Sequence, residues 1–271
     1  MIALLVTLLL VSAAALAFTY LGVTVVRRVV RHGVGDGHND VSAAIFGVGG
    51  TIYAVFLAFL VITVWADHDD AKNNVADEAS LLGTIYRAST AMEPQSGVRL
   101  RGLIRVYTRE VIEEEWPVQA QSGGTSEKAR EAGLNMFRLF GETPPAIRQN
   151  DMSIQQTILG LIAQMQADRN KRTLEAQEKI SPLIWAVALA NGLLVIVMSF
   201  FLYPDRDWPH VVMSAMLAAM IAMLVCVTWI LEQPFRGLMP LRAHPFEHSL
   251  EVYDSVDRMI LPAQAKPAPT E

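Results

Sequence analysis

Cysteine and charge are what this sequence has least of. Among 271 residues there is one cysteine, Cys226, which excludes an intrachain disulfide framework and an all-cysteine zinc site. Asp, Glu, Lys and Arg make up 18% of the chain, below the roughly 25% of an average soluble domain. The formal net charge is −5, so the basic footprint of a nucleic-acid-binding protein is missing. The sequence has no nucleotide-binding loop and no nucleophile elbow, and it gives no support for an enzyme or a bound cofactor.

The scarcity of charge is concentrated in long stretches. Four of them contain no Asp, Glu, Lys or Arg, and they run over Ile2–Val26, Val41–Ala66, Ile180–Pro204 and His210–Leu231. A helix of roughly 20 apolar residues crosses the ~30 Å hydrocarbon core of a bilayer, so each stretch is long enough to span it. The first is longer than the 7–15-residue core of a signal peptide and follows no basic residue. We therefore expect it to be a span that is kept.

These spans predict an all-α membrane protein, in which four transmembrane helices form two hairpins and a polar helical bundle is inserted between them. The predicted parts are a first transmembrane hairpin (1–66), a polar helical bundle continuous with the second span (67–180), a second transmembrane hairpin (181–233) and a C-terminal tail with Pro-Phe motifs (234–271). We expect a multi-pass protein of the cell (inner) membrane, in contact with the lipid bilayer.

The polar middle of the chain has helical periodicity and no alternating strand pattern. No proline interrupts Thr51–Met92, which predicts one helix running from the second span into the bundle. A second helix is predicted over Val98–Trp116 and is expected to stop at Pro117. Two more helices are indicated by apolar residues at helical spacing, namely Leu134, Phe137 and Phe140 in one and Ile147, Ile154, Ile158, Leu161 and Met165 in the other. Ser181-Pro182 should begin the third span.

The orientation in the membrane follows from the short connections. Arg27, Arg28, Arg31 and Arg206 lie in the two short loops, where the positive-inside rule applies best. This distribution predicts cytoplasmic loops and an extracytoplasmic polar domain. Basic residues before the third span and after the fourth favour the opposite orientation, so both orientations stay open from the sequence.

The second span holds a stripe of small residues, Gly47, Thr51, Ala54 and Ala58, at spacings of four, three and four. Small residues allow two membrane helices to approach closely. The same stripe would also suit a pore, where small side chains leave room and Thr51 offers a hydroxyl. Helix packing and pore lining are both open from the sequence.

Two acidic runs are candidates for contact with inorganic ions. Asp67, Asp69 and Asp70 lie where the second span leaves the membrane, and they are either a charged ring at a pore mouth or a solvated helix turn. Glu113, Glu114 and Glu115 come before Trp116 and Pro117, and they either bind cations or form a solvated helix end.

One motif has the letters of a zinc-protease site. His244-Pro245-Phe246-Glu247-His248 matches the H-x-x-E-H pattern. Two histidine ligands on one helical face, with a glutamate to activate water, are what that chemistry needs. A third ligand would have to come from the last 23 residues or from elsewhere, and Pro245 directly follows the first histidine. We predict no metal site.

Three ordered motifs resemble the bestrophin-like domain family of bacterial membrane proteins. They are the run from Gly49 to Phe59 with a later Val64-Trp65, the run from Val111 to Pro117, and Gln233-Pro234-Phe235-Arg236-Gly237 followed by His244-Pro245-Phe246-Glu247. The resemblance implies an oligomeric membrane protein similar to bestrophins, which are pentameric anion channels. Bestrophins carry an acidic calcium clasp after their Pro-Phe motif. Here Arg236, Gly237 and Leu238 stand in its place, and calcium gating is not expected.

Two functions from different classes follow. The first is a homo-oligomeric ion channel, anion-conducting by analogy, whose second span lines or flanks the pore. The second is a non-conducting membrane scaffold or sensor whose polar helical bundle binds a partner. Self-association is expected, inorganic ions are candidate partners and nucleic acid is not. The small stripe separates the two functions, because it borders a solvated axis in a channel and is buried against another helix in a scaffold.

Overall fold

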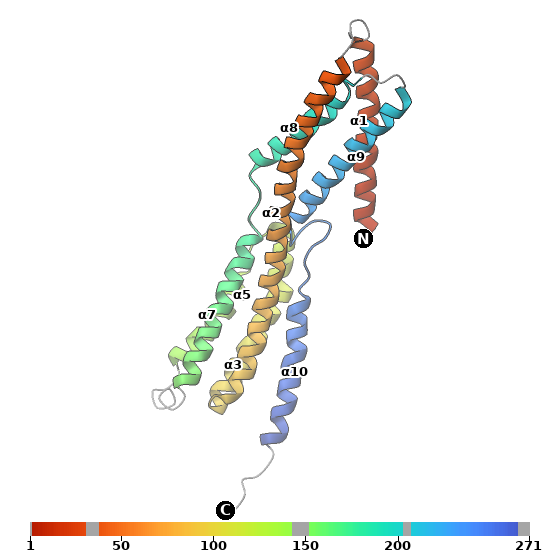
Figure 1. Cartoon of the computed structure of the whole chain (residues 1–271). Helices are drawn as coiled ribbons and strands as arrows, with labels where there is room; N and C mark the ends of the chain where they lie inside the picture. Colours follow the sequence, from red (N-terminus) through yellow and green to blue (C-terminus); the bar gives the residue numbers. More distant parts are fainter. Residues whose placement is uncertain (1, 31–37, 143–151, 203–206, 265–271) are drawn as a thin grey trace, which may run out of the picture. The chain divides into compact units, whose positions relative to one another are not determined.

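The structure, a computed structural model, describes residues 2–30, 38–142, 152–202 and 207–264. These residues contain helices and no strand, which confirms the all-α prediction. Four helices are long and apolar enough to span a membrane, and they are α1 (Ile2–Val30), α2 (His38–Ala88), α8 (Pro182–Ser199) and α9 (Asp207–Leu231) (Figure 1). The chain divides into a membrane unit (Met1–His68 and Lys179–Gln233) and a polar unit (Asp69–Glu178 and Pro234–Glu271).

In the membrane unit, α9 is the helix against which the others pack. Both α1 and α8 contact it. The sequence predicts that the first two spans form a hairpin, but in the described residues the main neighbour of α1 is α9 and not α2. Close packing is the driving force between helices in lipid, so the best-fitting surfaces and not the order in the chain decide which helices pair.

One face of α2 is buried in the membrane unit. It consists of Tyr53, Leu57, Leu60 and Val64, which recur at helical spacing and pack with Ala188, Val195 and Ile221. Two histidines join α2 to the ends of other helices. His38 Nε2 lies 3.1 Å from the Phe201 carbonyl oxygen, and His68 Nδ1 lies 3.3 Å from the Leu231 carbonyl oxygen.

Helix α2 is one helix of 51 residues, about 77 Å long at 1.5 Å per residue. That is more than twice the ~30 Å hydrocarbon core, so its second half extends beyond the apolar segment. A short 3-10 turn (Ser89–Ala91) follows, and Pro94 opens the next helix. The absence of proline predicts an unbroken helix over Thr51–Met92, and α2 is unbroken as far as Ala88.

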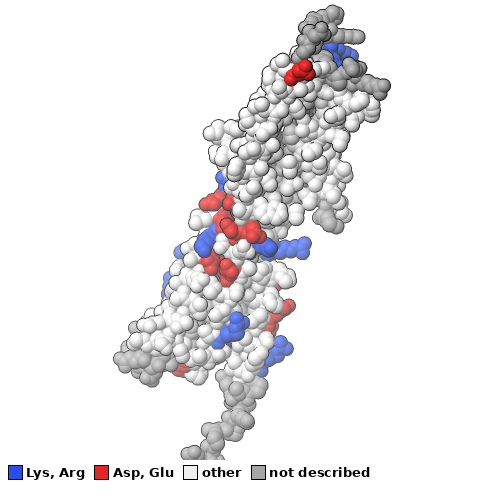
Figure 2. Space-filling view, viewed as in Figure 1, with Lys and Arg blue, Asp and Glu red and all other residues white. Residues whose placement is uncertain are grey.

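The polar unit is a set of helices around its own apolar core. Besides the second half of α2 it contains α3 (Pro94–Glu110), the π-helical turn η2 (Val111–Glu115), α4 (Trp116–Ser122), α5 (Glu127–Glu142), α7 (Met152–Glu175) and α10 (His244–Gln264). The core includes Leu82, Ile104, Met136, Ile162 and Tyr253. On the face drawn in Figure 2, charged side chains gather over the polar unit and are nearly absent from the membrane unit.

Pro117 does not end its helix, contrary to the prediction. The chain passes from α3 through η2 into α4, with Pro117 in the first turn of α4. Proline has no N–H to donate to the carbonyl four residues back, and its ring collides with that carbonyl. The wider π turn avoids the collision, since the Trp116 N–H bonds to the Val111 carbonyl, five residues earlier.

The other predicted helices are found with altered bounds. Helix α5 contains Leu134, Phe137 and Phe140, and α7 contains the predicted apolar positions except Ile147, which lies outside the described residues. Ser181 caps α8, since its Oγ accepts from the Leu183 N–H at 3.3 Å, which confirms the predicted start at Pro182. Helix α10 was not predicted, and it places the segment after Gln233 in the core of the polar unit through Phe235, Phe246 and Tyr253.

Candidate functional site

The small stripe of α2 is uncovered. Gly47, Thr51, Ala54 and Ala58 are all exposed, so no described helix of the same chain packs on them. The Thr51 hydroxyl donates to the Gly47 carbonyl of its own helix at 2.8 Å, which satisfies this polar group within the apolar segment.

A second face of α2 is also uncovered, and it is bulky. Ile52, Val55, Phe59 and Ile62 are each more than half exposed. Phe56 is half-buried and packs against the core that contains Tyr53 and Leu57. Within its apolar segment α2 therefore has one face buried in the chain and two faces open, one small and one bulky.

The aspartates at the polar end of this segment are solvated. Asp67, Asp69 and Asp70 are exposed, and Asp69 accepts from the Asn73 side chain at 3.4 Å and lies 4.0 Å from the Lys72 ammonium. All three stay available to face either a pore mouth or bulk solvent.

Within the acidic run, Glu115 differs from its two neighbours in burial. It is fully buried, whereas Glu113 is exposed and Glu114 pairs with Lys128 at 2.6 Å near the surface. The π turn carries Glu115 into the interior of the polar unit, beside the core residue Val111. Glu113 is therefore solvent-exposed within a continuous helical segment, whereas Glu115 is enclosed by protein.

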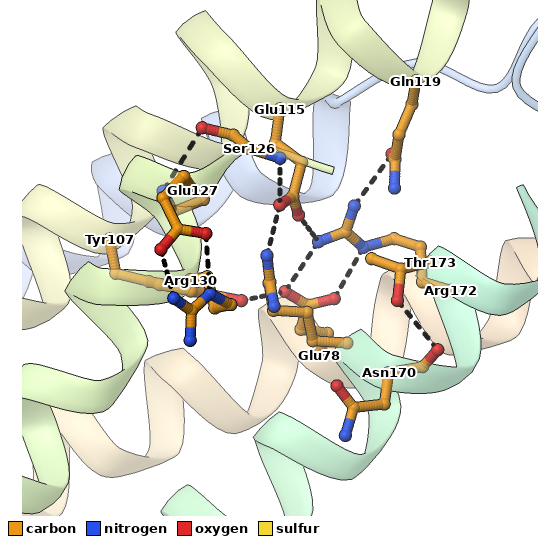
Figure 3. Close-up of polar contacts among 12 residues, drawn as sticks. Glu78, Tyr107, Glu115, Gln119, Ser126, Glu127, Arg130, Asn170, Arg172 and Thr173 are labelled. Carbon is orange, nitrogen blue, oxygen red and sulfur yellow. Dashed lines mark hydrogen bonds and ion pairs between the residues drawn. The ribbon is translucent and has the colours of Figure 1, made fainter. Parts of the chain in front are cut away.

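Glu115 belongs to a buried group that we call the arginine cluster, composed of Glu78, Tyr107, Glu115, Gln119, Arg169 and Arg172. Figure 3 shows Glu78, Glu115 and Gln119 directed at the Arg172 guanidinium. These side chains come from the second half of α2, from α3, from the η2–α4 segment and from α7.

Arg172 is the centre of this cluster and is fully buried. Its Nε donates to Glu78 Oε2 at 2.7 Å, and its Nη2 donates to Glu78 Oε1 at 3.2 Å and to Glu115 Oε1 at 2.8 Å. Its Nη1 donates to Gln119 Oε1 at 2.8 Å. The guanidinium thus forks between two carboxylates, the geometry in which arginine pairs most strongly.

The remaining carboxylate oxygens are also satisfied. The Tyr107 hydroxyl donates to Glu78 Oε1 at 2.6 Å. Glu115 Oε2 accepts from the Ser126 N–H at 3.1 Å and from Arg169. Two carboxylates face two guanidiniums, so the buried charges balance. A balanced, hydrogen-bonded set is the condition under which ionised groups persist in an interior.

Burial and charge act in opposite directions on Glu115. Burial alone would raise the pKa of its carboxyl, but Arg172 and Arg169 outweigh that effect and hold the pKa below its ordinary value. Burial raises the pKa of the Tyr107 hydroxyl well above its ordinary value, and the neighbouring Glu78 charge raises it further. Burial disfavours the charged form of Arg172, yet Glu78 and Glu115 raise its pKa overall. Near neutral pH, Glu115 and Arg172 are therefore charged and the Tyr107 hydroxyl is neutral.

Aromatic residues of the family motifs enclose Arg172. Its guanidinium carbon lies 5.4 Å from the Trp116 ring centroid and 5.6 Å from that of Phe246. Trp116 contacts Phe235 and Phe246 edge to face, each with ring centroids 5.7 Å apart. Cation–π contact with a desolvated guanidinium adds to the ion pairs. Residues of the second and third sequence motifs thus meet at one buried cation.

The other motif residues lie around the arginine cluster or at the surface near it. The Trp116 indole N–H donates to the Leu241 carbonyl at 3.1 Å, and the Leu241 N–H donates to the Pro234 carbonyl at 2.7 Å. The Pro245 carbonyl accepts from Ser249 at 3.0 Å, while Glu247 is exposed. His248 lies 3.1 Å from Glu251, and within the described ranges no group of three His, Cys, Asp or Glu side chains is arranged to hold a metal.

A second polar group, partly exposed to solvent, holds α10 against its neighbours. The Arg105 side chain lies 2.7 Å from Asp254 and 2.9 Å from Asp257, and its Nε donates to the Tyr86 hydroxyl at 3.0 Å. Tyr86 stacks on Tyr253 with ring centroids 4.3 Å apart. Burial raises the pKa of Tyr253. These contacts fix the C-terminal segment in the polar unit.

Comparison with known proteins identifies the family. A family profile described as Bestrophin-like domain matches residues 13–246, and the chain belongs to this bestrophin-like family. No curated protein sequence matches the chain. Several crystal structures share its fold at low identity.

One such structure is a variant of a bacterial bestrophin homologue from Klebsiella pneumoniae, with 12% identity, a TM-score of 0.68 and coverage of 96% of this chain and 99% of that chain. Another variant of a Klebsiella pneumoniae bestrophin homologue has 11% identity, a TM-score of 0.72 and coverage of 93% and 98%. A structure described as a membrane protein has 11% identity, a TM-score of 0.71 and coverage of 93% and 98%. At these identities the likeness concerns the fold.

Proposed function

We propose that the protein is a homo-oligomeric ion channel of the cell (inner) membrane, with α2 lining or flanking the pore. The observation that carries this proposal is the exposure of α2. Its apolar segment buries only the face of Tyr53, Leu57 and Val64, and leaves the small face and the bulky face open. Two open faces on one helix suit an assembly in which one face meets a neighbouring subunit and the other borders a central path.

Anion conduction is proposed by analogy with bestrophins, to which the family is related by its description. The exposed aspartates Asp67, Asp69 and Asp70 oppose it if they face the pore, because a ring of negative charge attracts cations. We propose an extracytoplasmic polar unit on the basis of the basic residues in the short loops. The competing function is a non-conducting scaffold or sensor, in which the small face is buried against another helix and no water path exists.

Native mass spectrometry and chloride efflux from liposomes test this proposal together. If the small face meets a neighbouring subunit, Ala54→Leu overfills that contact, reduces the fraction of intact oligomer and slows efflux. Ala190→Leu is the matched control, because Ala190 is exposed on α8 and is expected to leave both readings unchanged. An oligomer unaltered by Ala54→Leu and by Ala58→Leu would mean that this face touches lipid.

A further inference from the structure

A groove of about 1090 Å³ runs along the membrane unit, and nothing in the proposed conduction path requires it. Its walls come from α1, α8 and α9, and its floor includes Tyr53 of α2. The lining is almost wholly apolar, with members such as Val11, Leu189, Ile221 and Val225. Because every wall belongs to a membrane-spanning helix, the bilayer is the medium from which this groove is filled.

The two ends of the groove differ in chemistry. At one end are Lys179, Glu232 and Gln233, which lie next to the start of α8 and the end of α9. Toward the other end the lining residue Phe18 contacts Phe200, with ring centroids 6.1 Å apart. The site is therefore polar where two spans end and apolar along its length. That is the pattern of an amphiphile with one headgroup and a long tail.

The polar end offers two opposite charges. The Lys179 ammonium is exposed and forms no ion pair within the described part of the chain. Glu232 is half-buried and fixed, since its Oε1 accepts from the Ile180 N–H at 2.8 Å and its Oε2 from the Trp185 indole N–H at 3.0 Å. A carboxylate has about four acceptor positions, so Glu232 retains capacity for a further donor.

We propose that this groove binds a phosphatidylethanolamine-type phospholipid, with an acyl chain along the groove, the phosphate at Lys179 and the primary ammonium at Glu232. The two opposite charges at one end of the groove select a zwitterionic headgroup that carries N–H donors. Apolar burial of the chain supplies affinity, and the two charges supply selectivity. Lipid binding in this groove does not require conduction, so the two proposals can be tested separately.

Tyr53 provides the test between this occupant and a different one. Its hydroxyl is buried at the floor of the groove and has no hydrogen-bond partner in the described residues, and its ring lies against Gly192. An acyl chain has no acceptor for it. Tyr53→Phe should therefore leave phospholipid binding unchanged, whereas a ligand with a polar group deep in the groove would lose affinity.

Tryptophan quenching by brominated lipid measures the binding directly. Trp185 and Trp229 both line the groove, and Phe replaces Trp65 and Trp208 so that the two groove tryptophans report together with Trp116, which is half-buried against the core of the polar unit. In detergent micelles, phosphatidylethanolamine with brominated chains is expected to quench the two groove tryptophans to saturation at one lipid per subunit. Phosphatidylcholine, whose ammonium has no N–H, should bind several-fold more weakly.

Three variants complete the design. Lys179→Gln should weaken binding about fivefold, the effect of roughly 1 kcal/mol for one Lys at a phospholipid surface. Ala222→Phe fills the groove and should abolish saturable quenching, while Ala190→Phe, outside the groove on α8, should not. Lys179 is exposed, so Lys179→Gln is expected to fold. This variant therefore still tests the proposal if Ala222→Phe fails to fold. Equal quenching by both lipids, insensitivity to Lys179→Gln, or loss of binding in Tyr53→Phe would each overturn the proposal.

Discussion

Arg172 and Glu78 meet through two hydrogen bonds, from Nε at 2.7 Å and from Nη2 at 3.2 Å, with both side chains fully buried. The pair joins the polar half of the long helix α2 to α7, and Glu115 extends it to the η2 turn. Because α2 continues from the apolar segment into this contact, the arginine cluster fixes the polar end of the helix proposed to line or flank the pore.

Arg172→Met should strongly destabilise the polar unit. The change leaves Glu78 and Glu115 buried with only Arg169 to compensate them, and removing one partner of a buried pair typically lowers the free energy of unfolding by about 3–5 kcal/mol. Denaturant unfolding in detergent, followed by circular dichroism, measures it. Lys128→Gln is the control, since it removes only a surface partner of Glu114 and should change little. Equal unfolding midpoints for Arg172→Met and the native chain would show that the cluster contributes no stability.

The lowered pKa of Glu115 predicts a loss of stability in acid. A carboxyl whose pKa is lower folded than unfolded stabilises the fold above its ordinary pKa near 4.5, and this contribution disappears as pH falls through the folded pKa. Unfolding midpoints should therefore decrease below about pH 4.5. Glu115→Gln should be less stable at pH 7 and depend less steeply on acid, whereas Glu113→Gln, at an exposed position, should keep the native pH dependence. Identical acid profiles for all three chains would contradict this assignment.

Two glycines should respond to alanine in opposite directions. Gly123 has φ +70° at the end of α4, and an added Cβ would collide with the Ala176 carbonyl oxygen, so Gly123→Ala should destabilise. Gly160 lies within α7 with nothing within 4 Å of an added Cβ, and Gly160→Ala should stabilise by up to about 1 kcal/mol. Thermal unfolding of both variants in one detergent gives the comparison, and a stabilising Gly123→Ala would show that the left-handed turn is not required.

The sequence predicts the helices well and the arginine cluster poorly, for physical reasons. Charge-free stretches locate the four spans because a charged side chain is costly inside a bilayer. This cost applies to every span, whatever its position along the chain. The partner of α1 depends on surface fit between helices and has no local signal. The burial of Glu115 also has no local signal, since a π turn rotates it inward and an acidic run gives no sign of this.

One signal for the cluster was present. Ile158, Met165 and Arg172 follow one another at spacings of seven, and all three are buried in α7. A charged residue at the next position of an apolar repeat indicates a buried partner of opposite charge, and Glu78 and Glu115 are those partners. The repeat alone could not name them, because they come from distant parts of the chain.

The orientation of the polar unit is open to direct labelling. Cys226→Ser provides a cysteine-free background, and Glu113→Cys then introduces a thiol at an exposed position of the polar unit. The positive-inside rule predicts that a membrane-impermeant maleimide labels this thiol in intact cells. Gly35→Cys, in the first short loop and outside the described residues, should label only after the cells are opened. The reverse pattern would place the polar unit in the cytoplasm.

The reversal potential of purified oligomer in a planar bilayer under a KCl gradient tests the central claim most directly. The account predicts a current that reverses toward the chloride equilibrium potential. If Asp67, Asp69 and Asp70 face the pore, replacing all three with Asn should move the reversal potential further in that direction, because the charges that attract cations are gone. The absence of current across repeated reconstitutions of intact oligomer would contradict the channel and favour the scaffold.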